Sequence, residues 1–324
     1  QNKIIEIENI KTQISLKSII TNQFSIENLE ISTKSLKIKN LISFIRTFEN
    51  SPELFILEKS IKNGFLIADI KIEFDSNGNI KKNYEIDGFI KDVKLLFLKK
   101  YNIQKLNLAF DYRENDLILE DISFSLNDLN FLSDKISLKK INDNFLVEGN
   151  ANHKLINFDE KNLDLFIKPF FSKIDINTIK FSSINSFLFE ISKKFELKNF
   201  KIKSEMLIKE FSTKNKFDLK DILPEIKKDI LFLDNKLTIE YKKDYLDIKG
   251  KGDIFIQDKK DNLEFSINKN DDILTFKSSL KIKDNPFLID FLNYEKDKKS
   301  EVSIQYHGRQ NAKNEILIKE FSLS

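Results

Sequence analysis

Apolar and polar residues alternate with a period of two along much of this chain. Such a period places every second side chain on one face of a β-strand. Lys, Asp, Glu, Asn, Ser and Thr fill the positions between, so each predicted strand has one apolar and one charged face. The alternating apolar residues are Leu106, Leu108, Phe110 and Tyr112; Ile122, Phe124 and Leu126; Ile136 and Leu138; Leu263, Phe265 and Ile267; Leu280 and Ile282; and Ile316 and Ile318.

Short polar segments separate these predicted strands. Segments of this composition are typical of the turns of β-hairpins. Parallel strands would need longer, usually helical, connections. We therefore predict an antiparallel meander with turns at residues 75–79, 113–116, 142–144, 258–262 and 268–272.

A few segments have apolar residues at helical spacing instead. In residues 40–57 the apolar positions fit one helical face, and Ser51 and Pro52 then restart a helix, with Ser as the cap and Pro in the first turn. Helices are also predicted for residues 183–195, 219–233 and 285–294.

Strands with one apolar face can form two sheets packed as a sandwich, or one sheet that curls around something else. The long succession of strands, interrupted by helices, has no obvious second set of strands to cover the first. About fifteen strands side by side would make a sheet roughly 70 Å long. We predict a mainly β protein with an elongated, curled antiparallel sheet and short interrupting helices. It forms one segment over residues 1–324, with repeat units at 1–158 and 159–324.

The composition limits the function further. The 324 residues are 40% hydrophobic and include 30 Phe, which is too apolar for a disordered chain. The absence of Cys excludes disulfides and thiolate chemistry. The net charge is +3, from 54 basic and 51 acidic residues, and only Arg46, Arg113 and Arg309 among the basic ones are Arg. A nucleic-acid partner is not expected, because it would favour a basic excess and several Arg.

Candidate catalytic groups are scarce. His153 and His307 each stand alone in the sequence, so a histidine triad or a histidine-rich metal site is not expected. The carboxylates alternate with Lys on the predicted charged faces. Gly250 and Gly252 lack the third glycine and the following helix of a phosphate loop, and they indicate a bulge or a close backbone approach. We expect no enzyme activity, no cofactor and no metal.

One family resembles this pattern. Residues 7–11, 14–20 and 24–38 are similar to the opening strands of the AsmA-like proteins of Gram-negative envelopes, and most of all to the large YhdP-type members. Residues 132–138, 145–149, 237–239 and 248–252 fit the same style of strand pairs. The resemblance implies a taco-shaped repeating β-groove with an apolar interior, in the periplasm, that carries phospholipids between the inner and outer membranes without catalysis.

The resemblance also implies partners. The acyl chains of phospholipids are expected to lie in the groove, and the full-length protein is expected to be anchored in the inner membrane by a helix outside these residues. The alternative to a lipid conduit is an envelope scaffold or an outer-membrane-protein assembly factor of the AsmA-like type. Such a function implies envelope proteins as further partners. A β-sandwich adhesin or binding module is a third interpretation.

The apolar face of the strands is the candidate lipid-binding surface. Its lining is expected to be collective, with no single essential residue, and each member could equally belong to an ordinary core. The candidate lining residues are Phe65, Ile67, Ile70, Ile72, Phe74, Leu106, Leu108, Phe110, Ile122, Phe124, Leu126, Ile136, Leu138, Ile254, Ile256, Leu263, Phe265, Ile267, Leu274, Phe276, Leu280 and Ile282.

No stretch of the sequence approaches the roughly 20 apolar residues of a membrane-spanning helix. A charged and then apolar leader that ends in small residues is also missing from these residues. A strand pattern is already in progress near Gln1 and another ends near Ser324. We therefore expect the chain to be a segment of a longer protein, with the anchor upstream.

Overall fold

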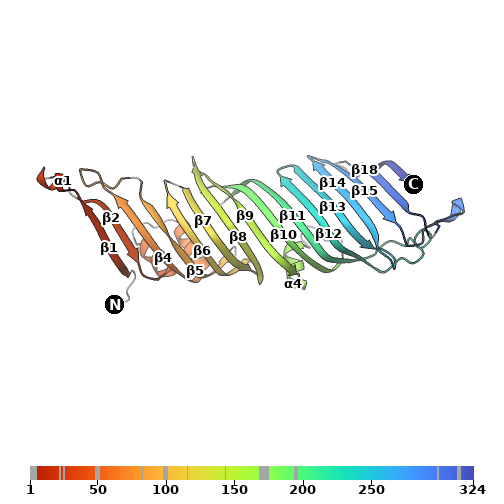
Figure 1. Cartoon of the computed structure of the whole chain (residues 1–324), viewed down its shortest axis with the longest axis horizontal. Coiled ribbons are helices and arrows are strands. Elements are labelled where there is room, and N and C mark those ends of the chain that lie inside the picture. Colours follow the sequence, from red (N-terminus) through yellow and green to blue (C-terminus); the bar gives the residue numbers. More distant parts are fainter. Residues whose placement is uncertain are drawn as a thin grey trace. The chain divides into compact units, whose positions relative to one another are not determined.

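The fold is described from a computed structural model, which describes residues 6–21, 23–24, 26–47, 52–81, 83–97, 101–114, 116–142, 144–167, 175–192, 196–297, 299–311 and 315–324. Seventeen strands belong to one antiparallel sheet (Figure 1). Two further short strands, β16 (Leu288–Ile289) and β17 (Tyr294–Glu295), pair with each other. The predicted fold class, a mainly β protein with an antiparallel sheet and short helices, is confirmed.

The chain divides into two compact units. Unit 1 comprises Gln1–Ala151 and Phe189–Lys198, and unit 2 comprises Asn152–Leu188 and Asn199–Ser324. Three strands contribute residues to both units: β9 (Asn144–Asn157), β10 (Ile176–Ser192) and β11 (Leu197–Lys214).

In unit 1, each strand pairs with the strand before and after it in the chain, except that β2 and β3 both pair with β4. The strands are β1 (Ile7–Ile14), β2 (Ile26–Thr33), β3 (Leu36–Lys37), β4 (Ile61–Glu73), β5 (Glu85–Phe97), β6 (Tyr101–Arg113), β7 (Asp116–Leu126) and β8 (Leu129–Ile141). The helices are α1 (Leu16–Ile20), α2 (Ile38–Ile45) and α3 (Pro52–Ser60).

Unit 2 continues the same meander from β11 to β19. Its strands after β11 are β12 (Asp229–Lys242), β13 (Tyr245–Phe255), β14 (Asp261–Asn270), β15 (Ile273–Ile282), β18 (Val302–Gln310) and β19 (Ile316–Leu323). Its helical segments are α4 (Glu160–Asn162), the π-helix η1 (Leu163–Ile167) and the 3₁₀-helix η2 (Asp290–Leu292).

Each unit has a small apolar core on one face of its sheet. In unit 1, Ile38 and Ile42 of α2 pack against Ile61 of β4 and Val93 of β5. In unit 2, Leu223 and Phe287 pack against Ile282 and Val302. Leu223 comes from the segment between β11 and β12, and Phe287 from the segment between β15 and β18. Ile282 is fully buried. Helices and loops, and no second large sheet, cover these parts of the described strands, so a β-sandwich is excluded.

Residues with left-handed backbone geometry interrupt several strands. Asp92, Lys105, Asp121 and Asp234 have φ angles between 49° and 53°. The strand register is irregular between Ile90 and Val93, between Gln104 and Asn107, and between Leu233 and Lys236. A bulge of this kind bends a strand and shifts the alternation of its side chains by one residue.

Side-chain amides replace backbone partners at these bends. The Oδ1 of Asn107 accepts a hydrogen bond from the backbone N–H of Asp92 at 3.0 Å, and its Nδ2 donates to the carbonyl of Lys105 at 2.9 Å. In unit 2, Asn235 Nδ2 donates to the carbonyls of Leu233 and Asp253, both at 2.9 Å. These hydrogen bonds lie within the sheet itself, although the Oδ1 atom of Asn235 is buried without a hydrogen-bond partner.

Two of the predicted helices are wrong, and two are partly right. Residues 183–192 belong to strand β10, in which the buried Ile179, Phe181 and Ser183 alternate with exposed or half-buried neighbours, and residues 193–195 lie outside the described residues. Residues 219–227 form turns and β12 begins at Asp229. Residues 285–294 hold only η2. The helices of residues 40–57 are present as α2 and α3 with Pro52 in the first turn, while Ser51 lies outside the described residues.

Candidate functional site

The candidate site in each unit is the face of the strands that carries the core of that unit, hereafter the apolar face. In unit 1 its side chains align across neighbouring strands. Phe110 of β6 lies opposite Leu119 of β7, and Leu119 lies opposite Ile136 of β8. A parallel row joins Tyr112, Leu117 and Leu138. All six of these side chains are half-buried.

Unit 2 has the same arrangement. Ile248 of β13 lies opposite Ile267 of β14, which lies opposite Phe276 of β15. Next to this row, Leu263, Leu280 and Ile304 join β14, β15 and β18. The phenyl ring of Phe276 packs against Tyr306, with centroids 6.1 Å apart. Apolar rows therefore cross at least three strands in each unit.

The structure brings most of the predicted lining residues onto this face. Bulges explain why odd-numbered and even-numbered residues can share it: Leu119 and Ile122 flank Asp121, and both face the same side. Phe74 packs against Phe24, with ring centroids 5.5 Å apart. The predicted residues on the apolar face are Ile70, Ile72, Leu106, Leu108, Phe110, Ile122, Phe124, Leu126, Ile136, Leu138, Ile254, Ile256, Leu263, Phe265, Ile267, Leu274, Phe276, Leu280 and Ile282.

Phe65 and Ile67 lie on the other face. Leu66, between them, packs against the core of unit 1, so the alternation of β4 turns both neighbours away from it. Ile67 is 45% exposed beside Phe89, which is 64% exposed. Apolar side chains on the charged face, together with the irregular register between Ile61 and Phe65, misled the sequence prediction at this strand.

Sequence reasoning missed several members of the apolar face. Ile86 and Ile90 precede the bend at Asp92, and Val93 and Leu95 follow it, so no single period of two contains all four. The left-handed Asp at the bend is the available signal, because Asp and Asn tolerate that geometry better than other side chains. The same signal marks Asp234 between Phe232 and Leu237.

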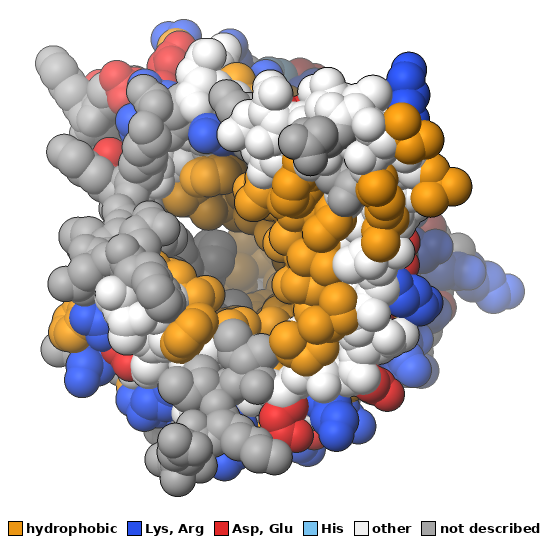
Figure 2. Space-filling view, turned by 90° about the vertical axis from the view of Figure 1, so that its left-hand side faces the viewer, with side chains coloured by type: hydrophobic (Ala, Val, Ile, Leu, Met, Phe, Trp, Pro, Cys, Tyr) orange, Lys and Arg blue, Asp and Glu red, His pale blue; other side chains and the backbone are white. Residues whose placement is uncertain are grey.

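Much of the apolar face has no second layer over it. Figure 2 shows hydrophobic side chains around a hollow at the end of the molecule that carries β1 and β2, with Lys, Arg, Asp and Glu around the outside. The segments of the described residues that pack on the sheet are short: the helices of unit 1, the two segments of unit 2 named above, and the connection after β9, where Phe158 packs against Phe181 of β10 at 5.2 Å. The rows between them keep part of their apolar area open to solvent.

The opposite face is charged and held by exposed ion pairs. Examples are Lys135 with Glu120 and Lys139 with Asp116, each at 3.5 Å. Exposed pairs of this kind contribute at most about 1 kcal/mol each. Their role is to keep this face hydrated, in contrast to the apolar face.

The described residues offer little for catalysis. No three His, Asp or Glu side chains in that part of the chain gather where they could hold a metal ion. The two histidines lie apart: His153 is buried against Phe181, and His307 forms an exposed pair with Glu320 at 3.2 Å. None of the helices that the structure describes has the length and apolar content needed to cross a membrane.

The comparisons with known proteins add no relative. The sequence matches no protein-family model, and neither a curated protein nor a solved structure matches it. The two faces of the sheet are therefore the features that point to a function.

Proposed function

We propose that the apolar face binds the acyl chains of phospholipids and that the protein is a non-catalytic lipid-transfer conduit. The observation that carries this proposal is the set of half-buried apolar rows in both units, which no second sheet covers among the described residues. Exposed contiguous apolar surface of this kind marks a binding site or an interface.

The energetics favour a long apolar ligand. Burial of one CH₂ group contributes about 0.8 kcal/mol, so a partly covered chain of about sixteen carbons recovers on the order of 10 kcal/mol. The rows Phe110, Leu119, Ile136 and Ile248, Ile267, Phe276 run across the strands and offer many similar positions. A ligand on such a surface can move in small steps, because no single position holds it much more tightly than the next.

The cellular setting is part of the same proposal. Its basis is the resemblance of residues 7–38 to AsmA-like envelope proteins. On that basis the conduit would act in the periplasm of a Gram-negative cell, between the inner and outer membranes. The phospholipid headgroups would stay in water at the open edge of the sheet, and an anchor outside these residues would hold the protein at the inner membrane.

Native mass spectrometry of the purified chain tests the proposal. The chain is incubated with vesicles of phosphatidylethanolamine and phosphatidylglycerol, re-isolated, and weighed without denaturation. We expect one or more phospholipids per chain, released by detergent. A chain that stays free of lipid after this exposure would overturn the proposal.

A second function has one observation in its favour. Every residue of β19 is exposed, including Ile316 at 65% and Phe321 at 67%. An exposed strand can accept a further strand through backbone hydrogen bonds. A scaffold or an outer-membrane-protein assembly factor would use such an edge. Binding of an unfolded outer-membrane β-strand peptide to this edge, with no uptake of phospholipid, would favour this alternative.

A further inference from the structure

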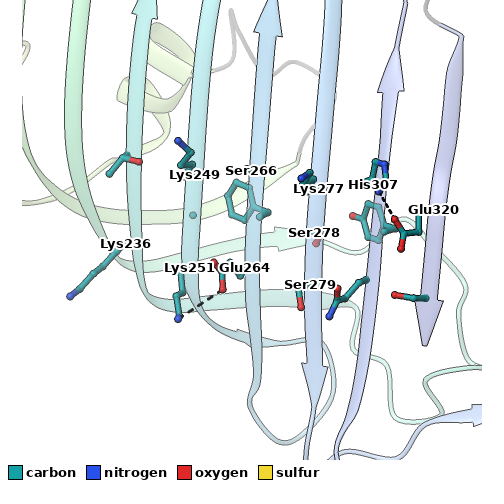
Figure 3. Close-up of a pocket in the computed structure, with 16 residues that line it drawn as sticks. Lys236, Lys249, Lys251, Glu264, Ser266, Lys277, Ser278, Ser279, His307 and Glu320 are labelled. Atoms are coloured by element: carbon teal, nitrogen blue, oxygen red, sulfur yellow. Dashed lines mark ion pairs between the residues drawn. The ribbon is translucent and has the colours of Figure 1, made fainter. Parts of the chain in front are cut away.

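The charged face of unit 2 has a hollow that the lipid proposal does not use. It has a volume of about 680 Å³ and lies over β12, β13, β14, β15, β18 and β19 (Figure 3). Two rows of side chains in register form its surface: Thr238, Lys249, Ser266, Lys277, His307 and Glu320; and Lys236, Lys251, Glu264, Ser279, Gln305 and Ser322. Long Lys side chains therefore stand around short hydroxyl side chains.

Both carboxylates that line the hollow, and three carboxylates next to it, have a basic partner. The pairs are Glu264 with Lys251 at 3.9 Å, Glu320 with His307 at 3.2 Å, Asp247 with Lys249 at 2.9 Å, Asp234 with Lys209 at 2.7 Å, and Asp253 with Lys260 at 3.1 Å.

Two cations of the hollow remain without a carboxylate in the described part of the chain. They are Lys236 and Lys277. Lys236 also lies directly opposite Lys251 on the next strand. Like charges in directly opposite positions destabilise a sheet, so an anion beside Lys236 would relieve a cost that the protein alone leaves in place.

The spacing of these cations restricts the ligand. Lys236 is on β12 and Lys277 on β15, which are three strand spacings apart, or about 14 Å. One phosphate group cannot meet both ammonium groups without drawing both side chains inward. Ser266 and Ser279 lie between them and offer hydroxyl groups that donate and accept hydrogen bonds. Two anionic groups on a hydroxyl-rich scaffold match this arrangement.

We propose that the hollow binds a saccharide with two phosphate groups, one at Lys236 and one at Lys277. The serine hydroxyls between them contact the sugar. Lys is suited to this role as a flexible point charge that follows a phosphate oxygen. The site is separate from the apolar face, because its side chains point to the other side of the same strands.

Isothermal titration calorimetry on the full chain tests the site, with fructose 1,6-bisphosphate as the probe. Fructose 6-phosphate and inorganic phosphate serve as single-anion comparators. We expect the bisphosphate to bind about tenfold more tightly than either comparator, because the second ion pair forms within the same complex. Added salt should weaken the binding. Equal affinity for all three ligands would overturn the proposal.

A matched pair of variants locates the binding. Lys236→Gln with Lys277→Gln should remove the preference for the bisphosphate. Lys135→Gln with Lys139→Gln, which makes the same change in net charge on the charged face of unit 1, should keep it. Bisphosphate binding that survives in the first variant contradicts the assignment. A chain that shows no heat of binding with the bisphosphate would also contradict it. If that chain binds vesicles of anionic phospholipid, and the Lys236→Gln, Lys277→Gln variant does not, the ligand is a membrane surface.

Discussion

The Nε2 atom of His153 lies 2.8 Å from the Oγ atom of Ser183, on the neighbouring strand. The Nδ1 atom lies 3.0 Å from the backbone carbonyl of Lys154, so it carries the proton, and Nε2 accepts from the serine hydroxyl. The ring meets Phe181 edge-on at 4.7 Å and is 8% exposed. The neutral imidazole is therefore fully satisfied in a mostly apolar setting.

The first prediction concerns the pH dependence that this burial causes. Burial lowers the pKa of His153, so the unfolded chain binds a proton more readily than the folded one. The contribution to stability is complete above the unfolded pKa of about 6.5 and is lost as the pH falls below it. Replacement by Gln removes this titration. In urea unfolding at pH 7 and pH 5, we expect the wild type to lose more stability than the variant; equal losses would contradict the assignment.

The second prediction concerns Asp261, which is 2% exposed. Its Oδ2 accepts from Asn285 Nδ2 at 2.8 Å, while its Oδ1 has no hydrogen-bond partner. Burial raises the pKa of this carboxyl to about 6 from 3.8. A raised carboxyl pKa means that its contribution to stability is present below the unfolded pKa and is lost as the pH rises through about 6.

Asp261→Asn should therefore stabilise the protein at neutral pH. The difference between the pKa of Asp261 in the folded chain, about 6, and in the unfolded chain, 3.8, corresponds to a gain in the free energy of unfolding on the order of 2–3 kcal/mol at pH 7. The gain near pH 4 should be small. Thermal unfolding at both values measures the difference. Asp272→Asn, in the exposed turn after β14, is the control and should change stability little at either pH. A variant that is less stable than the wild type at pH 7 would refute the burial argument.

The third prediction separates an open apolar face from a closed core. Leu138→Asp with Leu274→Asp places one charge on the apolar face of each unit. Ser137→Asp with Thr275→Asp places the same charges one residue away, on the charged face. The first variant should lose most of its bound phospholipid in native mass spectrometry, whereas the second should keep it.

Both variants of this pair should retain the circular dichroism of the wild type. The leucines are half-buried, so their replacement leaves the carboxylates in contact with water. Loss of folding in the Leu138→Asp, Leu274→Asp variant alone would mean that these side chains belong to a closed core.

The fourth prediction concerns the contact between Gly250 and Phe265. A Cβ atom at Gly250 would collide with the Phe265 ring and with Leu237. Gly250→Ala should destabilise the protein by about 1–3 kcal/mol. Phe265→Leu should recover part of that loss in the double variant, because the collision involves the ring. Additive effects in the cycle would contradict a direct contact.

The sequence predicts the strands far better than it predicts where they bend. Leu106, Leu108 and Phe110 alternate without a break, and they lie in strand β6 as expected. Ile184, Phe187, Leu188 and Ile191 have a spacing that fits one face of a helix, but pairing with neighbouring strands places them in β10. Such pairing joins residues distant in sequence, so a local pattern does not contain it.

The candidate site was predicted in part for a similar reason. Ile70 and Ile72 lie on the apolar face, but Phe65 and Ile67 do not, although all four belong to one strand. Hydrophobicity alone cannot tell which face of a strand is covered. The register with β5 and the contact of Leu66 with α2 decide this, and both depend on tertiary structure. The binding of lipid by this face stays a prediction.

The amide of Asn107, which joins the bends at Asp92 and Lys105, has a consequence for the proposed lipid-binding face. These hydrogen bonds lie within the strands, so the local curvature is set by the backbone whether or not a ligand is present. A two-layer core, by contrast, depends on its second layer for its shape. If this face binds acyl chains as proposed, its curvature in this part of unit 1 is the same with and without a lipid, and one acyl chain can replace another without any refolding of the protein.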